Sequence, residues 1–452
     1  MDLKALIQKY SISGPRYTSY PTAPQWSEAV GETAHRKALA RADARFPFAL
    51  YVHIPFCESL CLYCGCNIHL THDHSMGARY CEAVIHEIET MARLISGRPA
   101  VSQMAWGGGT PTFLSPEQIR RLFSAFREVF DFEPEAEVSL EVDPRVTTDA
   151  HFVELRSLGF NRLSLGVQDF DPVVQKAINR IQTSEMTLKT LERCRLLGFG
   201  GMNYDLIYGL PHQSLQTFAA TVDEVIRHSP DRIALYNYAH LPSLRPHQKA
   251  LERFPRPEAD VRTQLFEMAY QRFLEAGYVS IGMDHFAKPS DELALALSRR
   301  SLYRNFQGYT VKRGLPLLGF GASAISEFQD GYFQNVREVK VYEERIASTG
   351  LATLRGCQLS ESDLRRKWII QRLMCRLGFD FAEYEEEFGE SFSNLYATET
   401  AQLIPLIGDG LLVRNDHSLR VTDTGRLFVR NAAMVFDDYL LGESKATYSK
   451  TL

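Results

Sequence analysis

The chain contains the stretch Pro55-Phe-Cys57-Glu-Ser-Leu-Cys61-Leu-Tyr-Cys64-Gly-Cys66-Asn67, which holds four of its eight cysteines with the spacing Cys-x3-Cys-x2-Cys-x-Cys. Thiolates this close together can converge on one soft metal centre, and iron–sulfur clusters are bound by cysteine thiolates. The first three suffice for three irons of a cubane cluster and leave the fourth iron open. We therefore expect Cys57, Cys61 and Cys64 to bind one 4Fe-4S cluster.

Two other uses of these cysteines compete with a cluster. A structural zinc site takes four closed ligands, usually as two pairs separated by a longer loop, whereas here all the cysteines share one tight loop. A disulfide is disfavoured because the N-terminus does not have the pattern of a secretion signal. Because Cys66 is only two residues after Cys64, binding of both to one cubane is awkward, and we interpret Cys66 as a non-ligand near the active site. The remaining cysteines are scattered and are expected to be buried free thiols: Cys81, Cys194, Cys357 and Cys375.

Length and composition indicate an ordinary globular protein. The chain has 452 residues, enough for two or three domains, with 45% apolar and 23% charged residues. A net charge of −5 gives no sign of a nucleic-acid partner. No apolar run has the length of a membrane span, so we expect no membrane span and a cytoplasmic location.

A strand–helix alternation begins at residue 48. Six short apolar runs read as strands: Phe48–Ile54, Ser102–Trp106, Glu137–Val142, Asn161–Val167, Met202–Tyr208 and Asp231–Tyr238. Amphipathic helical patterns lie between them: Ala78–Leu94, Ser115–Phe130, Thr183–Leu197 and Leu215–His228. Such alternation predicts a parallel α/β sheet with its site at the carboxyl ends of the strands. The pattern alone leaves a doubly wound sheet, a partial barrel and a full eight-unit barrel open.

The two ends of the chain differ from this middle part. Ser13–Thr22 contains two prolines and a glycine, which forbid a regular element. The alternation stops near Leu359. The apolar segment Leu403–Ile407, a pair of short segments beginning at Leu411 and Ser418, and a helix after Thr422 suggest a small winged-helix-like domain. Nucleic-acid binding is one interpretation of that shape, but without a dense basic helix a lid or packing domain is favoured.

Three further motifs carry possible chemistry. The turn Gly107-Gly-Gly-Thr110 follows a strand and allows a ligand to approach the backbone closely, or is simply a tight turn. Glu141 and Asp205 are charged residues near the ends of apolar strands, suited either to a structural ion pair or to hydrogen bonds with ribose hydroxyls or an ammonium group. His69, His72 and His74 are interpreted as part of a solvated loop rather than as a metal site.

The cysteine spacing, with Tyr63 before the third cysteine, resembles the radical S-adenosylmethionine (SAM) signature. The extension to Cys66 makes it similar to the oxygen-independent coproporphyrinogen III oxidase family. The resemblance covers nearly the whole chain, including Gly14-Pro-Arg-Tyr17 and Gly282-Met-Asp-His285. It implies a partial (β/α)6 radical-SAM barrel over residues 46–355. Residues 1–45 would form an arm over the active site, and residues 356–452 a mostly helical, winged-helix-like domain.

The resemblance also implies a reaction. The two propionates of coproporphyrinogen III that become vinyl groups would lose carbon dioxide, giving protoporphyrinogen IX, after a 5′-deoxyadenosyl radical formed from SAM at the cluster removes a hydrogen. Two SAM molecules, a one-electron reductant such as a flavodoxin or ferredoxin, and a monomer are expected. Two relatives are the alternatives: a haem-binding chaperone, which usually lacks Cys66 and the Gly14–Tyr17 motif, and a methyltransferase or haem-opening enzyme.

Site roles follow from the same resemblance. The first SAM would be bound by Tyr51, Tyr63, Gly108, Gly109, Thr110, Glu141 and Ile325. The second would be bound by Gln168, Arg180, Asp205 and Ala239. Catalytic roles next to the substrate are expected for Cys66, Arg16 and Tyr20.

Overall fold

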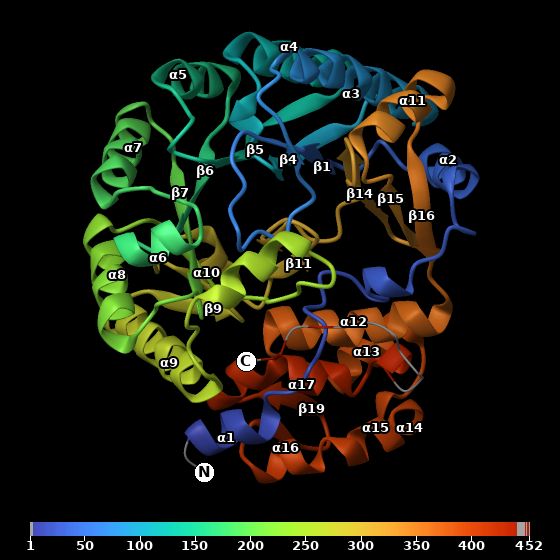
Figure 1. Ribbon diagram of the computed structural model, residues 1–452. Helices are drawn as coiled ribbons and strands as arrows, with labels where there is room; N and C mark the ends of the chain where they lie inside the picture. Colours follow the sequence, from blue (N-terminus) through green and yellow to red (C-terminus); the bar gives the residue numbers. More distant parts are fainter. Residues whose placement is uncertain (1–2, 441–447, 449, 452) are drawn as a thin grey trace. The chain divides into compact units, whose positions relative to one another are not determined.

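The computed structural model describes residues 3–440, 448 and 450–451, and its chain forms two compact units (Figure 1). The larger unit comprises Ser27–Tyr278 and Gly314–Gly356, and the smaller comprises Met1–Trp26, Val279–Arg313 and Cys357–Leu452. The units regroup segments that are distant in sequence. The three-part division with boundaries after residues 45 and 355 therefore stays a prediction.

The larger unit is organised by six consecutive parallel strands. They are β1 (Phe48–Ile54), β4 (Ala100–Gly108), β5 (Asp131–Val142), β6 (Arg162–Gln168), β7 (Gly201–Tyr208) and β8 (Arg232–Asn237). Each pairs with the next in chain order, and all pairs are parallel. The order never reverses, which excludes the doubly wound alternative. The six predicted strands and the partial barrel are confirmed.

Helices cover the outside of this curved sheet (Figure 1). They are α3 (Ser75–Leu94), α4 (Pro116–Val129), α5 (Asp149–Leu158), α7 (Ser184–Leu196), α8 (Leu215–His228) and α9 (Ala259–Glu275). The short helix α6 (Pro172–Ala177) instead belongs to an apolar cluster with Leu62 and Tyr63. The start of α4 follows the sequence closely, because Ser115 caps it with a capping box to Gln118 and Pro116 occupies the first turn. Strand β1 is buried along both faces, with only Tyr51 partly exposed. The sheet thus lies between the helices and an inner surface, and this inner surface is available for a site.

The other side of β1 continues the sheet differently. Strand β13 (Leu317–Phe320) pairs with β1 in parallel, and β14 (Ile325–Phe328), β15 (Gly331–Asn335) and β16 (Thr353–Gln358) follow outward. The pairs β13–β14 and β14–β15 are antiparallel. Short elements complete the unit: α2 (Glu32–Arg41), β2 (Phe56–Cys57), β3 (His69–Leu70), η2 (Pro111–Phe113), η3 (Pro246–Arg253) and α11 (Val339–Thr349).

The smaller unit is mostly helical. Its helical elements are α1 (Leu3–Tyr10), η1 (Ala23–Gln25), α10 (Glu292–Ser298), α12 (Glu361–Arg376), α13 (Phe381–Phe388), α14 (Phe392–Leu395), α15 (Ala397–Gln402), α16 (Ile404–Gly408), η4 (Thr424–Phe428), α17 (Val429–Met434) and η5 (Asp438–Leu440). Its strands form a β9–β10 hairpin (Val279–Gly282, His285–Ala287), a β11–β12 hairpin (Tyr303–Asn305, Gly308–Thr310) and a sheet of β17 (Gly378–Asp380), β18 (Leu412–Arg414) and β19 (Ser418–Val421). The predicted strand pair near residues 411 and 418 and the helix after Thr422 are confirmed.

The N-terminal stretch Ser13–Thr22 has no helix or strand, as predicted, yet it is well packed. Tyr17 and Tyr20 are buried in the core of the smaller unit. Arg430 of α17 donates hydrogen bonds to the carbonyls of Gly14 and Pro15. Among the residues that the structure describes, no helix is long and apolar enough to cross a membrane.

Candidate active site

The cysteine loop begins where β1 ends, at the carboxyl edge of the six parallel strands. Cys57 lies on β2, which pairs with β3 on the far side of the loop. The segment after α6 fixes the middle of the loop. The amide of Leu62 donates to the Ile178 carbonyl at 2.9 Å, and the Asn179 side chain donates to the Leu60 carbonyl at 2.9 Å.

A second segment, Arg245–Gln248 at the start of η3, binds three successive carbonyls of the loop. The Gln248 amide donates to the Tyr63 carbonyl at 2.9 Å and to the Ala239 carbonyl at 3.2 Å. His247 Nε2 lies 2.9 Å from the Cys64 carbonyl oxygen. Arg245 donates twice to the Gly65 carbonyl, at 2.9 and 2.7 Å. Sequence reasoning missed these residues, because contacts to backbone carbonyls leave no motif.

The three predicted cluster ligands have different surroundings. Cys57 Sγ lies 3.5 Å from the Thr110 hydroxyl, and burial raises the pKa of this thiol to about 11. Cys61 Sγ is contacted by two guanidinium groups, from Arg145 at 3.5 Å and Arg180 at 3.6 Å. The side-chain hydrogen bond with Cys66 lowers the pKa of Cys64 to about 7.

The two arginines at Cys61 are held by one carboxylate. Asp143 Oδ2 lies 2.6 Å from Arg145 and 3.0 Å from Arg180. Burial alone would raise the pKa of Asp143, but the two guanidinium groups outweigh it and lower the pKa to about 2. Arg180 also donates to the Gly166 carbonyl at 2.6 Å. Two cations beside one sulfur can stabilise the negative charge that a cysteine carries when it binds iron. The donor set therefore fits an iron–sulfur cluster.

The next question is whether other side chains of the described residues could hold a single metal ion. Within the described residues, no three His, Cys, Asp or Glu side chains are arranged to hold one ion. His74 instead pairs with Glu58 at 2.9 Å and stacks on Phe113. Cys66 is exposed, and its backbone amide lies 3.4 Å from Cys64 Sγ.

The turn Gly107–Thr110 needs glycine at positions 108 and 109, because neighbouring atoms leave no room for a side chain. A Cβ on Gly109 would lie 2.7 Å from the backbone of Pro55 and Phe56, so the turn and the cysteine loop pack backbone to backbone. Gly108 has φ +112°, a left-handed value that favours glycine, and a Cβ there would meet the His53 ring at 2.5 Å. The amides of Gly109 and Thr110 donate to the carbonyls of Ile54 and Phe56, each at 2.8 Å. The turn therefore supports the start of the loop.

Two carboxylates lie at the ends of neighbouring strands. Glu141 on β5 accepts a hydrogen bond from the Gly108 amide at 3.0 Å. Glu141 reaches solvent. Its pKa is nevertheless raised to about 7, mainly because the surrounding protein desolvates the carboxylate and secondly because Asp205 is negatively charged. Asp205 on β7 accepts hydrogen bonds from Ser164 at 3.1 Å and Asn203 at 2.9 Å, and burial raises its pKa to about 6. Neither carboxylate has a cationic partner within salt-bridge distance in the described part of the chain.

The remaining candidates of the larger unit also face this edge. The Tyr51 hydroxyl lies 3.2 Å from His53 Nδ1, and β1 pairs Tyr51 with Gly319, against which the backbone of Ile325 packs. Gln168 has φ +67° and ends β6. A Cβ on Gly166 would meet both the Gln168 and Arg180 side chains, at 2.8 and 3.1 Å, so these two lie over the same backbone.

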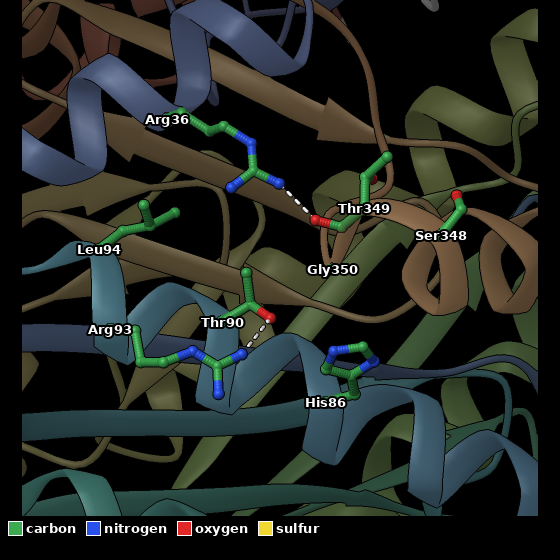
Figure 2. Close-up of a pocket in the computed structure, with 8 residues that line it drawn as sticks. All are labelled: Arg36, His86, Thr90, Arg93, Leu94, Ser348, Thr349 and Gly350. Atoms are coloured by element: carbon green, nitrogen blue, oxygen red, sulfur yellow. Dashed lines mark hydrogen bonds between the residues drawn. The ribbon is translucent and has the colours of Figure 1, made fainter.

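Two cavities of the larger unit differ in their relation to this site. One of about 220 Å³ opens beside the cluster loop and is lined by Cys57, Thr110, Asp143 and Arg145 among others. Figure 2 shows the other, of about 350 Å³, where Arg36 donates to the Thr349 carbonyl and Arg93 donates to Thr90 at 3.1 Å. None of the predicted site residues lines this second cavity.

Two predicted residues belong to the smaller unit. Arg16 pairs with Asp284, which lies in the turn between β9 and β10. Tyr20 is 2% exposed, packs edge-on against Tyr439, and its hydroxyl accepts a hydrogen bond from the Asp438 amide at 3.4 Å. Their catalytic roles stay predictions. Of the scattered cysteines, Cys81, Cys194 and Cys375 are buried as predicted, whereas Cys357 is partly exposed because β16 lies at the edge of its sheet.

Comparison with known proteins gives two family matches and full-length relatives. The family model of the Radical SAM superfamily matches residues 51–225, and that of the HemN C-terminal domain matches residues 359–428. The oxygen-independent coproporphyrinogen III oxidase of Salmonella typhimurium is 45% identical over 96% of this chain and 95% of its own length. That of Pseudomonas aeruginosa is 42% identical over 99% of this chain and 98% of its own.

A solved structure is similar over the same extent. Coproporphyrinogen III oxidase (HemN) from Escherichia coli, described as a radical SAM enzyme, superposes with a TM-score of 0.92. It is 42% identical and covers 97% of this chain and 99% of its own. The likeness therefore spans both units and all the loops described above.

Proposed function

The chain belongs to the family of oxygen-independent coproporphyrinogen III oxidases, and we propose that it converts coproporphyrinogen III to protoporphyrinogen IX by oxidative decarboxylation of two propionates. When bound, a 4Fe-4S cluster and SAM supply the 5′-deoxyadenosyl radical that this chemistry uses. The observation that carries the proposal is the cysteine loop itself. Its three thiols lie at the carboxyl edge of a six-strand partial barrel, with two arginines beside the middle sulfur.

Cys57, Cys61 and Cys64 would hold the cluster. Arg145 and Arg180 stabilise the negative charge that Cys61 carries as a ligand, and Asp143 keeps both guanidinium groups in place. Cys66 stays off the cluster and acts near the substrate. Its exposure, next to a more buried Cys64, is consistent with that division.

SAM would bind beside the open iron. The backbone of Gly108, Gly109 and Thr110 can approach the ligand closely, because no side chain intervenes at the two glycines. Glu141 can accept hydrogen bonds from ribose hydroxyls or from the SAM ammonium group. Tyr51, Tyr63 and Ile325 would complete this first position.

A second SAM position would use Gln168, Arg180, Asp205 and Ala239. Gln168 and Arg180 already lie together over Gly166. Arg180 Nε is buried and has no hydrogen-bond partner among the described residues, so one donor stays available for a ligand. Asp205 offers a carboxylate with a raised pKa of about 6, which a cationic ligand would lower.

The remaining parts of the proposal concern the substrate and partners. Arg16 would bind a propionate and Tyr20 would act beside the substrate, both as parts of an arm that covers it. A one-electron reductant such as a flavodoxin or ferredoxin would supply the electron, and the protein would act as a monomer in the cytoplasm.

An anaerobic turnover assay tests the proposed function. Reconstituted protein should bind about four irons and form protoporphyrinogen IX through a tricarboxylic intermediate. Cys61→Ala should lose both the cluster absorption and turnover, and Cys66→Ala should keep the absorption but lose turnover. Cys194→Ala, which removes a buried thiol of α7, is the matched control and should behave as wild type. Consumption of haem with no change in coproporphyrinogen III would overturn the proposal.

A further inference from the structure

The smaller unit contains a cavity of about 620 Å³, a size typical of small-molecule sites. Its walls come from β9, α10, the end of α12, β19 and η4. All its lining residues belong to the smaller unit, whereas the cluster cysteines all belong to the larger one. The active site proposed above does not use this cavity.

Four arginines line the cavity: Arg300, Arg376, Arg420 and Arg426. Arg300 is exposed and has no side-chain partner among the described residues. Arg376 lies 4.0 Å from Glu383, which is also 3.5 Å from a fifth arginine, Arg372. The cavity therefore has more cationic than anionic groups.

The other two arginines, Arg420 and Arg426, each have one carboxylate partner. Arg420 pairs with Asp380 at 2.5 Å. Arg426 pairs through its Nε with Asp423 at 3.3 Å, and the side chain of Asp423 is 98% exposed. Burial, with repulsion from Arg313 second, lowers the pKa of Arg376. Arg300 and Arg376 therefore have the least compensated charge of the four arginines, and an anionic ligand would pair with them.

The rest of the lining is apolar. Val279, Leu295, Leu297, Leu377 and Val421 contribute to it, and Leu295 is 41% exposed on α10. An inorganic anion or a sugar phosphate would gain nothing from these side chains. An apolar ligand that carries several carboxylates would bury apolar surface and pair with the guanidinium groups.

We propose that this cavity binds a tetrapyrrole through its propionates, as a second site for the class of molecule that the reaction consumes and releases. The ligand class rests on the proposed function, while the arginines and the apolar lining are independent of it. The planar guanidinium binds a carboxylate through two parallel hydrogen bonds, so Arg300 and Arg376 can each bind one propionate.

The test is equilibrium dialysis of the anaerobic holoenzyme with SAM against coproporphyrin III, the oxidised and stable form of the substrate. Wild type should bind two equivalents. Arg300→Gln/Arg376→Gln should bind one, with the second weakened at least tenfold, while turnover at saturating substrate is unchanged. Arg299→Gln, which removes the neighbouring arginine outside the cavity lining, should bind two.

A fluorescent reporter at the cavity shows whether the second equivalent of porphyrin binds there. In Leu295→Trp, coproporphyrin III should quench the added tryptophan, and the double arginine substitution should remove that quenching. Citrate, which has carboxylates but no apolar ring, should not displace the porphyrin at equal concentration. One equivalent in wild type, two in the double variant, or equal displacement by citrate would each overturn the second site. Absence of turnover with two bound equivalents would instead overturn the proposed function and leave the cavity assignment standing.

Discussion

At the scale of single residues, the inner edge of the barrel combines two carboxylates of raised pKa with two arginines that already have an anionic partner. Glu141 and Asp205 repel each other and have no cationic partner within salt-bridge distance among the described residues. Arg180 and Arg145 are instead occupied by Asp143 and the Cys61 sulfur. A cationic ligand such as SAM would therefore find unsatisfied negative charge at Glu141 and Asp205.

This arrangement predicts how SAM affinity depends on pH. A carboxyl group with a pKa of about 7 is mostly protonated below that pH and ionised above it. SAM carries a positive sulfonium, so its affinity should rise by up to about tenfold between about pH 6 and about pH 8. Glu141→Gln should weaken binding and remove most of this rise. Calorimetric titration of the cluster-loaded protein would measure both effects.

The matched control is Glu89→Gln on α3, which removes an exposed carboxylate 3.9 Å from Arg93. Its pH dependence should follow that of wild type. An unchanged slope in Glu141→Gln would show that Glu141 does not contact SAM.

At the scale of elements, the cysteine loop is held by two segments that come much later in the chain. The segment after α6 binds the carbonyl of Leu60, and Arg245–Gln248 bind those of Tyr63, Cys64 and Gly65. Gln248 is 1% exposed and also accepts from the Leu241 amide at 2.6 Å. These contacts fix the backbone that carries two of the three ligands.

Gln248→Ala should therefore loosen the loop without unfolding the barrel. Removing one partner of buried hydrogen bonds costs about 1–3 kcal/mol for each group left unsatisfied. We expect the variant to release iron to a chelator several-fold faster than wild type under anaerobic conditions. Gln271→Ala, which removes an exposed glutamine of α9 bonded to Glu275 at 3.1 Å, should release iron at the wild-type rate. Equal rates in both variants would mean that η3 does not stabilise the cluster site.

At the scale of the whole molecule, the N-terminal residues up to Trp26 are part of the smaller unit rather than a loose tail. Leu6, Ile7, Tyr17 and Tyr20 belong to its hydrophobic core, and Arg430 binds the carbonyls of Gly14 and Pro15. Removing the whole stretch would expose that core. A point substitution is therefore the sharper test of the predicted role of Arg16.

Arg16→Gln should leave the cluster and SAM cleavage intact, but fewer of the cleavage events should lead to product. We expect the ratio of 5′-deoxyadenosine to vinyl groups formed to rise several-fold, because a propionate would lose its bidentate partner. Asp284→Asn breaks the same ion pair but keeps the guanidinium, and its ratio should stay near that of wild type. A similar rise in both variants would reduce Arg16 to a structural partner of Asp284.

The sequence by itself determined the features that depend on neighbouring positions. The spacing of Cys57, Cys61 and Cys64 predicted a cluster loop, and family membership supports it, because three ligands within eight positions must lie close in space. The alternation of apolar runs and amphipathic helices predicted six strands, since each pattern reports on a short segment: β1, β4, β5, β6, β7 and β8. Pattern alone left sheet and barrel open, and the chain-order pairing of the strands decided between them.

Only the tertiary structure decided what surrounds the loop. Arg145, Arg245 and Gln248 bind a sulfur or a carbonyl of a loop that lies about 80 to 180 positions away in sequence. Such contacts depend on how strands and helices bring distant backbone together, and a carbonyl acceptor is present at every residue, so no motif marks the partner. The same reason explains the arginine-lined cavity. Its four arginines come from three separate stretches of sequence, and only folding of the smaller unit places them around one space.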